Sequence, residues 1–177
     1  MPSISPAQSF ADAVGAAIGE PAKLFKDKAI MKPPGAFGYA VHQDFTNWQE
    51  LPVPPELLIT ALVAIDPGSE QNGGLKLYPG LHHGHLRPAE KPGDIFNPDA
   101  GLVPDEMPTD VQPELVPVQS GDLVLFSSLA PHFSGPNRSD RKRRTLFLSY
   151  NAARFGDVYD LYYENFYGYL KKDRQRE

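Results

Sequence analysis

The chain has 177 residues, 41% of them apolar and 22% charged, which is the composition of one globular domain rather than of a disordered segment. Its 17 basic and 22 acidic residues give a net charge of −5, which argues against general binding to nucleic acid or anionic membranes. The lack of cysteine excludes disulfides, thiolate metal sites and cysteine nucleophiles, and it fits a cytoplasmic protein. We expect no membrane span and no signal peptide, because no apolar run approaches roughly 20 residues and the N-terminus has no basic start.

Turn-forming residues divide the chain into short apolar segments. The 19 prolines and 15 glycines cluster between runs rich in Val, Leu, Ile, Phe and Tyr, a pattern typical of an all-β sandwich or barrel. A first helix is expected over 7–19, where alanine and apolar residues recur. We expect strands near residues 23–32, 38–45, 57–65, 75–78, 115–118, 122–127 and 144–151.

The stretch 41–48, VHQDFTNW, carries a histidine and an acid one residue apart. Because residues i and i+2 of a β-strand point to the same face, we expect His42 and Asp44 to converge and Gln43 to face the other way. A neutral imidazole nitrogen and a carboxylate suit a divalent metal. The alternative is a surface strand with two unrelated polar residues.

A long segment without hydrophobic periodicity runs from Arg87 to Pro113 and contains six prolines. Loops of this length in a compact domain are usually functional or disordered. We therefore predict a loop that is mobile at the barrel mouth and becomes ordered when substrate binds.

Further along, residues 121–126 (GDLVLF) predict a turn followed by a buried strand. The next residues predict an exit into a loop that holds His132, and a second strand then returns with Arg143 and Arg144 at its start. This predicted hairpin brings the two arginines back toward the histidine. A guanidinium group binds a carboxylate through two parallel hydrogen bonds, so one of them is a candidate anion ligand.

Together, His42, Asp44 and His132 offer two imidazoles and one carboxylate. This ligand set is the facial triad of non-haem iron(II) oxygenases, which leaves three coordination positions open. A 2-oxo acid such as 2-oxoglutarate fills two of them and dioxygen the third. The far carboxylate of 2-oxoglutarate then needs a cation, which an arginine supplies.

Four segments in this order resemble the phytanoyl-CoA dioxygenase family of iron(II)/2-oxoglutarate-dependent oxygenases. They are LFKDKAIMKPPG, HQDFTNW, LLITALVAIDPGSEQNGGLKLYPGLHHGHL and GDLVLFSSLAPHFSGPNRSDRKRRT, and the resemblance runs from about Leu24 to Tyr150. It implies an all-β core, a double-stranded β-helix (jelly roll, cupin-like) with a few peripheral helices. We expect a single domain over 1–177, with a shortened N-terminal helical region.

The resemblance also implies roles around the cosubstrate. Arg143, eleven residues after His132, matches the arginine that binds the distal carboxylate of 2-oxoglutarate, and Ser134 matches a residue that contacts the same molecule. Lys32 falls where some relatives hold 2-oxoglutarate with a lysine, and Lys28 lies nearby on the same predicted strand. Leu62 stands where some relatives carry an aromatic residue, so that wall of the pocket is expected to differ.

The implied activity is hydroxylation of a small-molecule C–H bond, with conversion of 2-oxoglutarate to succinate and CO2. His42, Asp44 and His132 match the iron ligands, and the presence of Asp44 argues against the halogenating variant, which has a small residue there. The resemblance does not name the substrate, because family members act on acyl-CoA thioesters, amino acids, phosphonates and secondary metabolites. The resemblance also implies that His82, His83 and His85 lie in a loop near the pocket mouth and do not form a second metal site.

Two other functions stay open. A non-catalytic or truncated jelly-roll module of the same family is favoured by the 41 residues before His42, where relatives carry a longer helical segment. A cupin-type metalloenzyme that does not use 2-oxoglutarate would have no need of Arg143.

The C-terminal tail predicts an aromatic helix over about 157–172. Aromatic and apolar residues recur there at helical spacing, namely Tyr159, Tyr162, Tyr163, Phe166, Tyr167 and Leu170. Packing of this face on the barrel is the simplest interpretation. A homodimer contact or a lid is the alternative.

Overall fold

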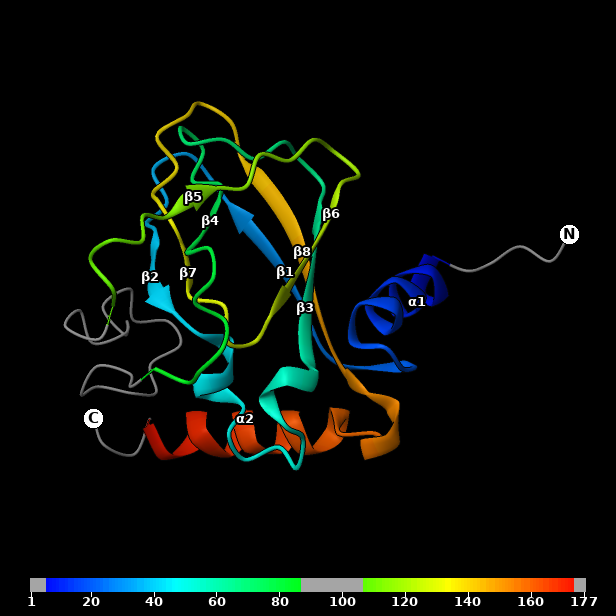
Figure 1. The fold of residues 1–177 in the computed structure, drawn as a ribbon. Coiled ribbons are helices and arrows are strands. Elements are labelled where there is room, and N and C mark those ends of the chain that lie inside the picture. Colours follow the sequence, from blue (N-terminus) through cyan, green and yellow to red (C-terminus); the bar gives the residue numbers. More distant parts are fainter. Residues whose placement is uncertain (1–5, 87–106, 174–177) are drawn as a thin grey trace, which may run out of the picture.

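The computed structural model describes residues 6–86 and 107–173 as two four-stranded sheets with a helix at each end of the chain (Figure 1). In the described part of the chain, α1 is the first element and α2 the last, and short 3-10 helices (η) join some of the strands. The elements in chain order are α1 Pro6–Ile18, β1 Ala22–Lys32, β2 Tyr39–His42, η1 Asp44–Asn47, η2 Pro55–Leu57, β3 Leu58–Ala64, β4 Leu75–Leu77, β5 Glu114–Leu115, β6 Leu123–Ser127, β7 His132–Ser134, β8 Arg143–Ala152, η4 Ala153–Phe155 and α2 Tyr159–Asp173.

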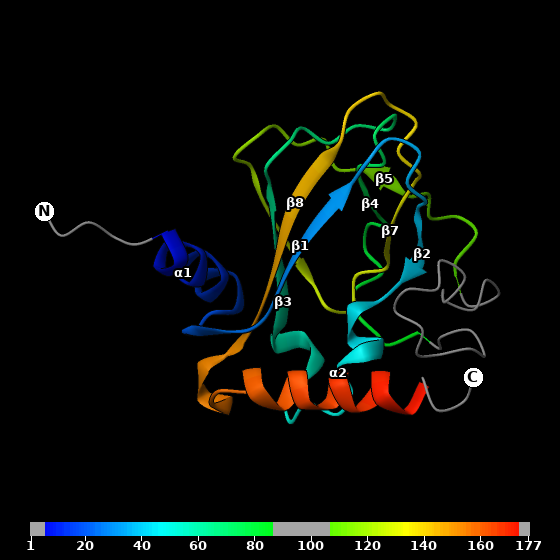
Figure 2. The ribbon, with the colours of Figure 1, turned by 180° about the vertical axis from the view of Figure 1, so that it is seen from behind.

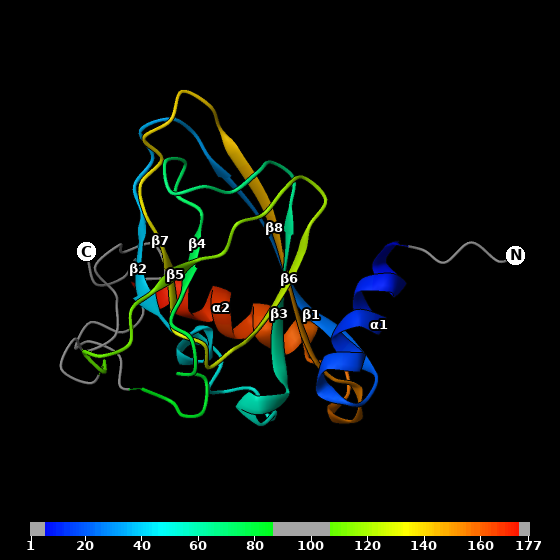
Figure 3. The same ribbon diagram turned by 45° about the horizontal axis from the view of Figure 1, so that its top comes forward.

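The two sheets have the strand orders β1-β8-β3-β6 and β2-β7-β4-β5, and every pair is antiparallel. The sheets stand opposite each other in Figure 3, and the chain crosses between them repeatedly. This is the expected double-stranded β-helix, so the predicted fold class is confirmed. Such a barrel encloses an interior to which both sheets contribute side chains.

The predicted hairpin after residue 121 is wrong. β6 and β8 belong to one sheet but β3 lies between them, and the segment between β6 and β8 forms β7 of the other sheet. His132 is therefore the first residue of a strand and not part of a loop. The strand escaped sequence analysis because it has only three residues, between Pro131 and Gly135, too few to show alternation.

The strand predicted over 38–45 is also too long. β2 ends at His42, and Asp44 starts the 3-10 helix η1. The argument that His42 and Asp44 share one face of a single strand is therefore wrong, and a different geometry brings them together.

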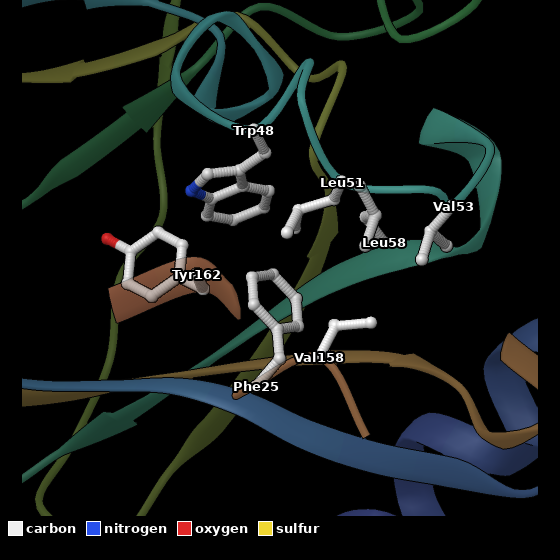
Figure 4. Close-up of a cluster of buried hydrophobic side chains, with 7 residues drawn as sticks. All are labelled: Phe25, Trp48, Leu51, Val53, Leu58, Val158 and Tyr162. Atoms are coloured by element: carbon white, nitrogen blue, oxygen red, sulfur yellow. The ribbon is translucent and has the colours of Figure 1, made fainter. Parts of the chain in front are cut away.

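Apolar side chains cover the outside and one end of the barrel. α1 lies beside the sheet β1-β8-β3-β6 (Figure 2). On the outer face of this sheet, Val14 of α1 packs with Ala61 and Tyr150. At the end covered by α2, a second cluster surrounds Phe25 and Trp48 (Figure 4). The remaining members of this second cluster are Leu51, Val53, Leu58, Val158 and Tyr162.

The expected C-terminal helix is present as α2, and hydrogen bonds attach it to β1. The hydroxyl of Tyr159 donates to the carboxylate of Asp27 at 2.8 Å, and the hydroxyl of Tyr163 donates to the backbone carbonyl of Asp27 at 3.0 Å. Tyr162 is 9% exposed, as packing against the barrel requires, whereas Tyr167 is 56% exposed. α2 therefore closes one end of the barrel.

The helices and strands described above do not test two of the expectations from the sequence. Most of the predicted loop from Arg87 to Pro113 lies outside the described residues, and the single domain over 1–177 stays a prediction. Within the described ranges, no helix combines the length and the apolar character needed to cross a bilayer.

Candidate functional site

Three potential metal ligands meet where β2 and β7 run side by side. His42 ends β2 and pairs in register with His132, the first residue of β7, so that their ring centroids lie 4.2 Å apart. Asp44 follows at the start of η1. One ligand atom from each of the three side chains lies within 4.8 Å of the others. The structure thus brings together the three residues that the sequence selected.

The backbone fixes both imidazoles in the same way. Nδ1 of His42 lies 2.8 Å from the carbonyl oxygen of Ala40, and Nδ1 of His132 lies 2.9 Å from that of Ala130. A carbonyl oxygen only accepts, so each Nδ1 carries the proton and each Nε2 keeps a lone pair for a metal. Burial, with the neighbouring His132, lowers the pKa of His42 to about 4, which keeps this ring neutral at physiological pH.

Asp44 is held as a charged carboxylate. Burial opposes its charge, yet its pKa is lowered, because Lys26, the two histidines and the hydroxyl of Thr60 stabilise the anion. The Thr60 hydroxyl donates to Oδ2 at 2.9 Å and lies 3.3 Å from the Ser149 hydroxyl. Because the Thr60 hydroxyl donates its hydrogen to Asp44, it can only accept a hydrogen bond from the Ser149 hydroxyl. Sequence analysis missed this pair, although alternation along β3 and β8 places both on the inner face.

Gln43 fixes the turn between the two ligands. Its backbone is extended (φ −107°, ψ 131°), and its fully buried amide donates to the carbonyls of Gly84 and Leu129 and accepts from the backbone N–H of Leu86 at 2.8 Å. Gln43 therefore does face away from the ligands, as expected. These hydrogen bonds fix the backbone between the end of β2 at His42 and the start of η1 at Asp44. The side chains of His42 and Asp44 therefore converge on the candidate metal site.

A second polar cluster lies at the far end of β1 and at the start of β8. Lys32 pairs in register with Arg143, and both are buried (2% and 6% exposed). The Lys32 ammonium donates to the Ser134 hydroxyl at 2.9 Å and to the carbonyl of Gly135 at 2.6 Å. The Arg143 guanidinium donates to the Thr145 hydroxyl at 2.8 Å. We call Lys32, Ser134, Arg143 and Thr145 the cationic cluster.

Among the described residues, Lys32 and Arg143 form no salt bridge, although Asp66 acts on Arg143 electrostatically. Burial, together with the charge of Arg143, lowers the pKa of Lys32 to about 8, and burial lowers the pKa of Arg143. Two buried cations in register, without a salt bridge, form a site for an anion. Arg144 points outward instead and forms a salt bridge with Asp66.

Lys28 does not join this cluster in the structure. Its ammonium lies 5.5 Å from the ring centroid of Tyr39, and its pKa is lowered by burial and by Lys26, against the opposing effect of Asp44. Its electrostatic neighbours are therefore at the metal end. Leu62 is buried in an apolar cluster that includes Leu75 and Phe126.

The other histidines stand apart from the triad. The rings of His82 and His83 have centroids 4.0 Å apart, and His85 contacts Phe45 at 5.0 Å and the Thr46 hydroxyl at 3.4 Å. In the described part of the chain they do not form a second group of three metal ligands.

Comparisons with known proteins agree with this geometry. A sequence model described as phytanoyl-CoA dioxygenase (PhyH) matches residues 3–145. A methylphosphonate hydroxylase of Gimesia maris is 41% identical over 152 residues, which are 86% of this chain and 54% of that protein. A 2-aminoethylphosphonate dioxygenase of an uncultured bacterium is 36% identical over 143 residues, 79% of this chain and 50% of that protein.

Among solved structures, EctD from S. alaskensis with 2-oxoglutarate and 5-hydroxyectoine aligns with a TM-score of 0.68 and 20% identity. The alignment covers 86% of this chain and 54% of EctD, and it shows the shared fold. The chain spans about half the length of the curated relatives it matches. With more than half of its residues matched by the family model, the chain belongs to the phytanoyl-CoA dioxygenase family.

Proposed function

We propose that this chain carries the catalytic centre of an Fe(II)/2-oxoglutarate-dependent dioxygenase, which hydroxylates a small-molecule C–H bond and converts 2-oxoglutarate and O2 to succinate and CO2. The observation that carries the proposal is the convergence of His42, Asp44 and His132 inside a barrel that also holds a buried cationic cluster, which forms no salt bridge within the described ranges. The hydroxylase and dioxygenase names of its relatives support the same reaction class.

The donor set fits iron(II). His42 and His132 hold Nδ1 against backbone carbonyls and leave Nε2 for a metal, and Asp44 presents a charged carboxylate, as the 2-His-1-carboxylate triad requires. When bound, the iron supplies the activation of dioxygen, and the protein supplies binding and orientation. Thr60 holds one oxygen of Asp44, so that the other stays available as a ligand.

In this proposal the cationic cluster binds the distal carboxylate of 2-oxoglutarate. Arg143 and Lys32 supply charge, and Ser134 supplies a hydroxyl already bonded to Lys32. Thr145 fixes the guanidinium plane before the cosubstrate arrives. Lys28, on the same inner face of β1, is proposed to contact the cosubstrate from the metal side. Leu62 forms an apolar wall that keeps water from the reacting groups.

We propose a small organophosphonate as the substrate class. The two relatives described above are named for methylphosphonate and 2-aminoethylphosphonate. The other groups of the family, acyl-CoA thioesters, amino acids and secondary metabolites, are the alternatives that a substrate screen has to include.

The test is succinate formation by the purified chain with Fe(II), 2-oxoglutarate and O2, in the presence and absence of candidate substrates. We expect turnover that requires both iron and 2-oxoglutarate and that rises with a phosphonate. Metal binding without any succinate would identify a non-catalytic module of the family. Metal-dependent oxygen uptake without 2-oxoglutarate would identify a cupin-type enzyme.

Two finer expectations stay predictions: a cytoplasmic location, and a homodimer formed through α2. The exposed ring of Tyr167 on α2 supports the second. Light scattering at several protein concentrations would show whether two copies associate, and the variant Tyr167→Lys would show whether α2 is the contact.

A further inference from the structure

One set of polar groups in the barrel interior belongs neither to the metal ligands nor to the cationic cluster. Lys26 lies on the inner face of β1, paired with Ser149 of β8. A register shift between Leu24 and Lys26 makes Phe25 an extra residue in the strand. This bulge sends Phe25 into the apolar cluster under α2 and brings the ammonium of Lys26 within electrostatic reach of Asp44.

The ammonium group of Lys26 has aromatic neighbours but no hydrogen-bond acceptor within bonding distance among the described residues. It lies 4.7 Å from the ring centroid of Trp48 and 5.9 Å from that of Tyr162. Aromatic faces attract a cation but accept none of its three hydrogens as a carboxylate or phosphonate would. Lys26 therefore keeps its hydrogen-bonding capacity for another molecule.

Trp48 adds a second unused donor. Its ring is 1% exposed, and no described residue accepts a hydrogen bond of good geometry from its indole N–H, although the Tyr162 hydroxyl lies near enough to interact with it. Figure 4 shows this nitrogen and the hydroxyl of Tyr162 on the same side of the apolar cluster. Buried N–H groups without partners are rare, because they lose their bond to water and gain nothing in exchange. A ligand that accepts a hydrogen bond would satisfy Trp48.

The charge of the interior also requires an anion. Lys26, Lys28, Lys32 and Arg143 face inward, and Asp44 is the carboxylate that acts on the first two of them. The charge of a ferrous ion and the double negative charge of 2-oxoglutarate cancel. In their charged forms these side chains leave positive charge in excess after both have bound. Burial lowers the pKa of each of the three lysines, and a bound anion would stabilise the charged form.

We propose that Lys26, together with the indole N–H of Trp48 and the hydroxyl of Tyr162, binds the phosphonate group of the substrate beside the metal centre. This inference rests on the proposed function and assigns the residues that select its substrate. Lys26 acts electrostatically on Asp44, so a phosphonate held by Lys26 would bind on the metal side of the barrel, with its attached carbon nearest to the reacting group. The α-carbon of the phosphonate is then the position that is hydroxylated, which replaces one C–H bond with C–OH.

The experiment measures binding of methylphosphonate to the protein loaded with iron(II) and 2-oxoglutarate without oxygen, by calorimetry. Lys26→Met removes the charge and keeps a flexible apolar chain, and Trp48→Phe removes the N–H and keeps an aromatic ring. We expect the Kd for methylphosphonate to rise on the order of 10- to 100-fold in Lys26→Met and about 3- to 10-fold in Trp48→Phe. Affinity for 2-oxoglutarate should not change in either variant, and Trp48→Phe should bind iron like the parent protein. Because Lys26 also acts on Asp44, iron affinity is measured first in Lys26→Met and the phosphonate titration is run with the metal site saturated.

Lys23→Met is the matched control, because Lys23 lies on the same strand but is exposed and paired with Asp157 at 3.1 Å. It should bind methylphosphonate like the parent protein. Methanesulfonate has the same tetrahedral shape and one negative charge fewer at neutral to alkaline pH, so we expect it to bind more weakly.

Three results would overturn the inference. One is a parent-like Kd for methylphosphonate in folded Lys26→Met, and another is tighter binding of methanesulfonate than of methylphosphonate. The third is a parent protein that binds iron and 2-oxoglutarate and forms succinate but binds no phosphonate, in which case the proposed reaction survives and only the substrate assignment fails. Loss of iron and 2-oxoglutarate binding in the parent would instead refute the proposed function itself. If Lys26→Met does not fold, Trp48→Phe decides alone.

Discussion

The two faces of the sheet β1-β8-β3-β6 differ in the polarity of their buried side chains, and the alternation of its sequence does not reveal this difference. The outer face is apolar and packs under α1 through residues such as Ala61 and Tyr150. The inner face carries Thr60, Ser149 and Arg143, all buried and all hydrogen-bonded. In most β-sandwiches the apolar face points inward. Here the inner face is mixed, because Leu62 and Phe147 also join an apolar cluster with Leu75 of the other sheet, and the polar groups beside that cluster are left for binding.

Because both faces of the sheet carry apolar residues, alternation alone does not choose between Arg143 and Arg144. The strand positions that share a face with Arg144 are Leu146, Leu148 and Tyr150, which are the more apolar set and would ordinarily be assigned to the inside. Tyr150 is buried and Leu148 partly buried there, in the apolar cluster that includes Val14 of α1. The difference between the faces therefore predicts that inner-face variants affect binding and that outer-face variants affect stability.

The largest effect is expected from the metal ligands. His132→Ala removes an imidazole that a buried carbonyl has already oriented, so metal affinity should fall by more than the ~100-fold that loss of an outer-shell partner costs. Calorimetric titration with a divalent metal would measure it. The outer-face variant Leu148→Ala should lower stability by about 2 kcal/mol and leave metal affinity intact. A parent-like metal affinity in His132→Ala would refute the triad.

The next largest effect concerns Arg143. Loss of a charge-assisted pair in a buried site should cost roughly 2–5 kcal/mol, which corresponds to about 30- to several-thousand-fold in 2-oxoglutarate affinity. Arg143→Ala should show this loss while metal binding stays nearly unchanged. Titration of the metal-loaded protein with 2-oxoglutarate under nitrogen measures both quantities. Weak metal binding in this variant would mean that the two clusters are not independent.

Sequence analysis found the residues of the site more reliably than their geometry. The long strands β1, β3 and β8 were predicted within one residue at most ends, because each shows a sustained pattern bounded by turns. His42 and Asp44 were selected for a reason that proved wrong, since Asp44 lies in η1 and not in β2. The resemblance to a family supplied the correct pairing with His132, whose strand is too short to be recognised.

Other contributions could not be read from local sequence. The hydrogen bond from Thr60 to Asp44 and the one from Gln43 to Leu129 join residues whose distance in space depends on the whole fold. The position of Lys26 depends on the bulge at Phe25, which breaks the alternation of β1.

A smaller effect is expected for Thr60, which orients Asp44 from the inner face. Thr60→Val keeps the shape and removes the hydroxyl, so metal affinity or activity should fall about 10- to 100-fold. Thr60→Ser keeps the hydroxyl and should recover most of the loss. If Thr60→Ser is as impaired as Thr60→Val, the methyl group and not the hydrogen bond is what matters. Metal titration of the three proteins distinguishes these outcomes.

Affinity for 2-oxoglutarate should also depend on pH through Lys32. Burial and Arg143 lower its pKa to about 8 in the free protein, so a growing fraction of the protein must gain a proton before binding at higher pH. The Kd should be constant below pH 8 and rise by up to about tenfold per pH unit above it. Lys32→Arg, charged throughout, should show no such rise. A flat profile in the parent protein would contradict the proposed role.

The charge of Lys32 has the opposite consequence for stability. Its folded pKa lies below the ordinary 10.5, so the unfolded chain binds the proton more tightly. The charged form therefore destabilises the protein below pH 8, and this cost disappears as the pH rises from 8 toward 10.5. Denaturant unfolding without cosubstrate should show it in the parent protein and not in Lys32→Met.

The smallest effect is expected from Arg144, on the outer face beside the inner-face Arg143. Its guanidinium bonds both carboxylate oxygens of Asp66 at 2.8 Å, and this pairing lowers the pKa of Asp66 to about 2 against an ordinary 3.8. The stability that the pair contributes is present above about pH 4 and is lost as the pH falls toward 2. Arg144→Ala should therefore unfold at a slightly higher pH on acidification, with an unchanged Kd for 2-oxoglutarate at neutral pH. A large loss of 2-oxoglutarate affinity in Arg144→Ala, with little effect in Arg143→Ala, would mean that β8 is shifted by one residue and that its two faces are exchanged.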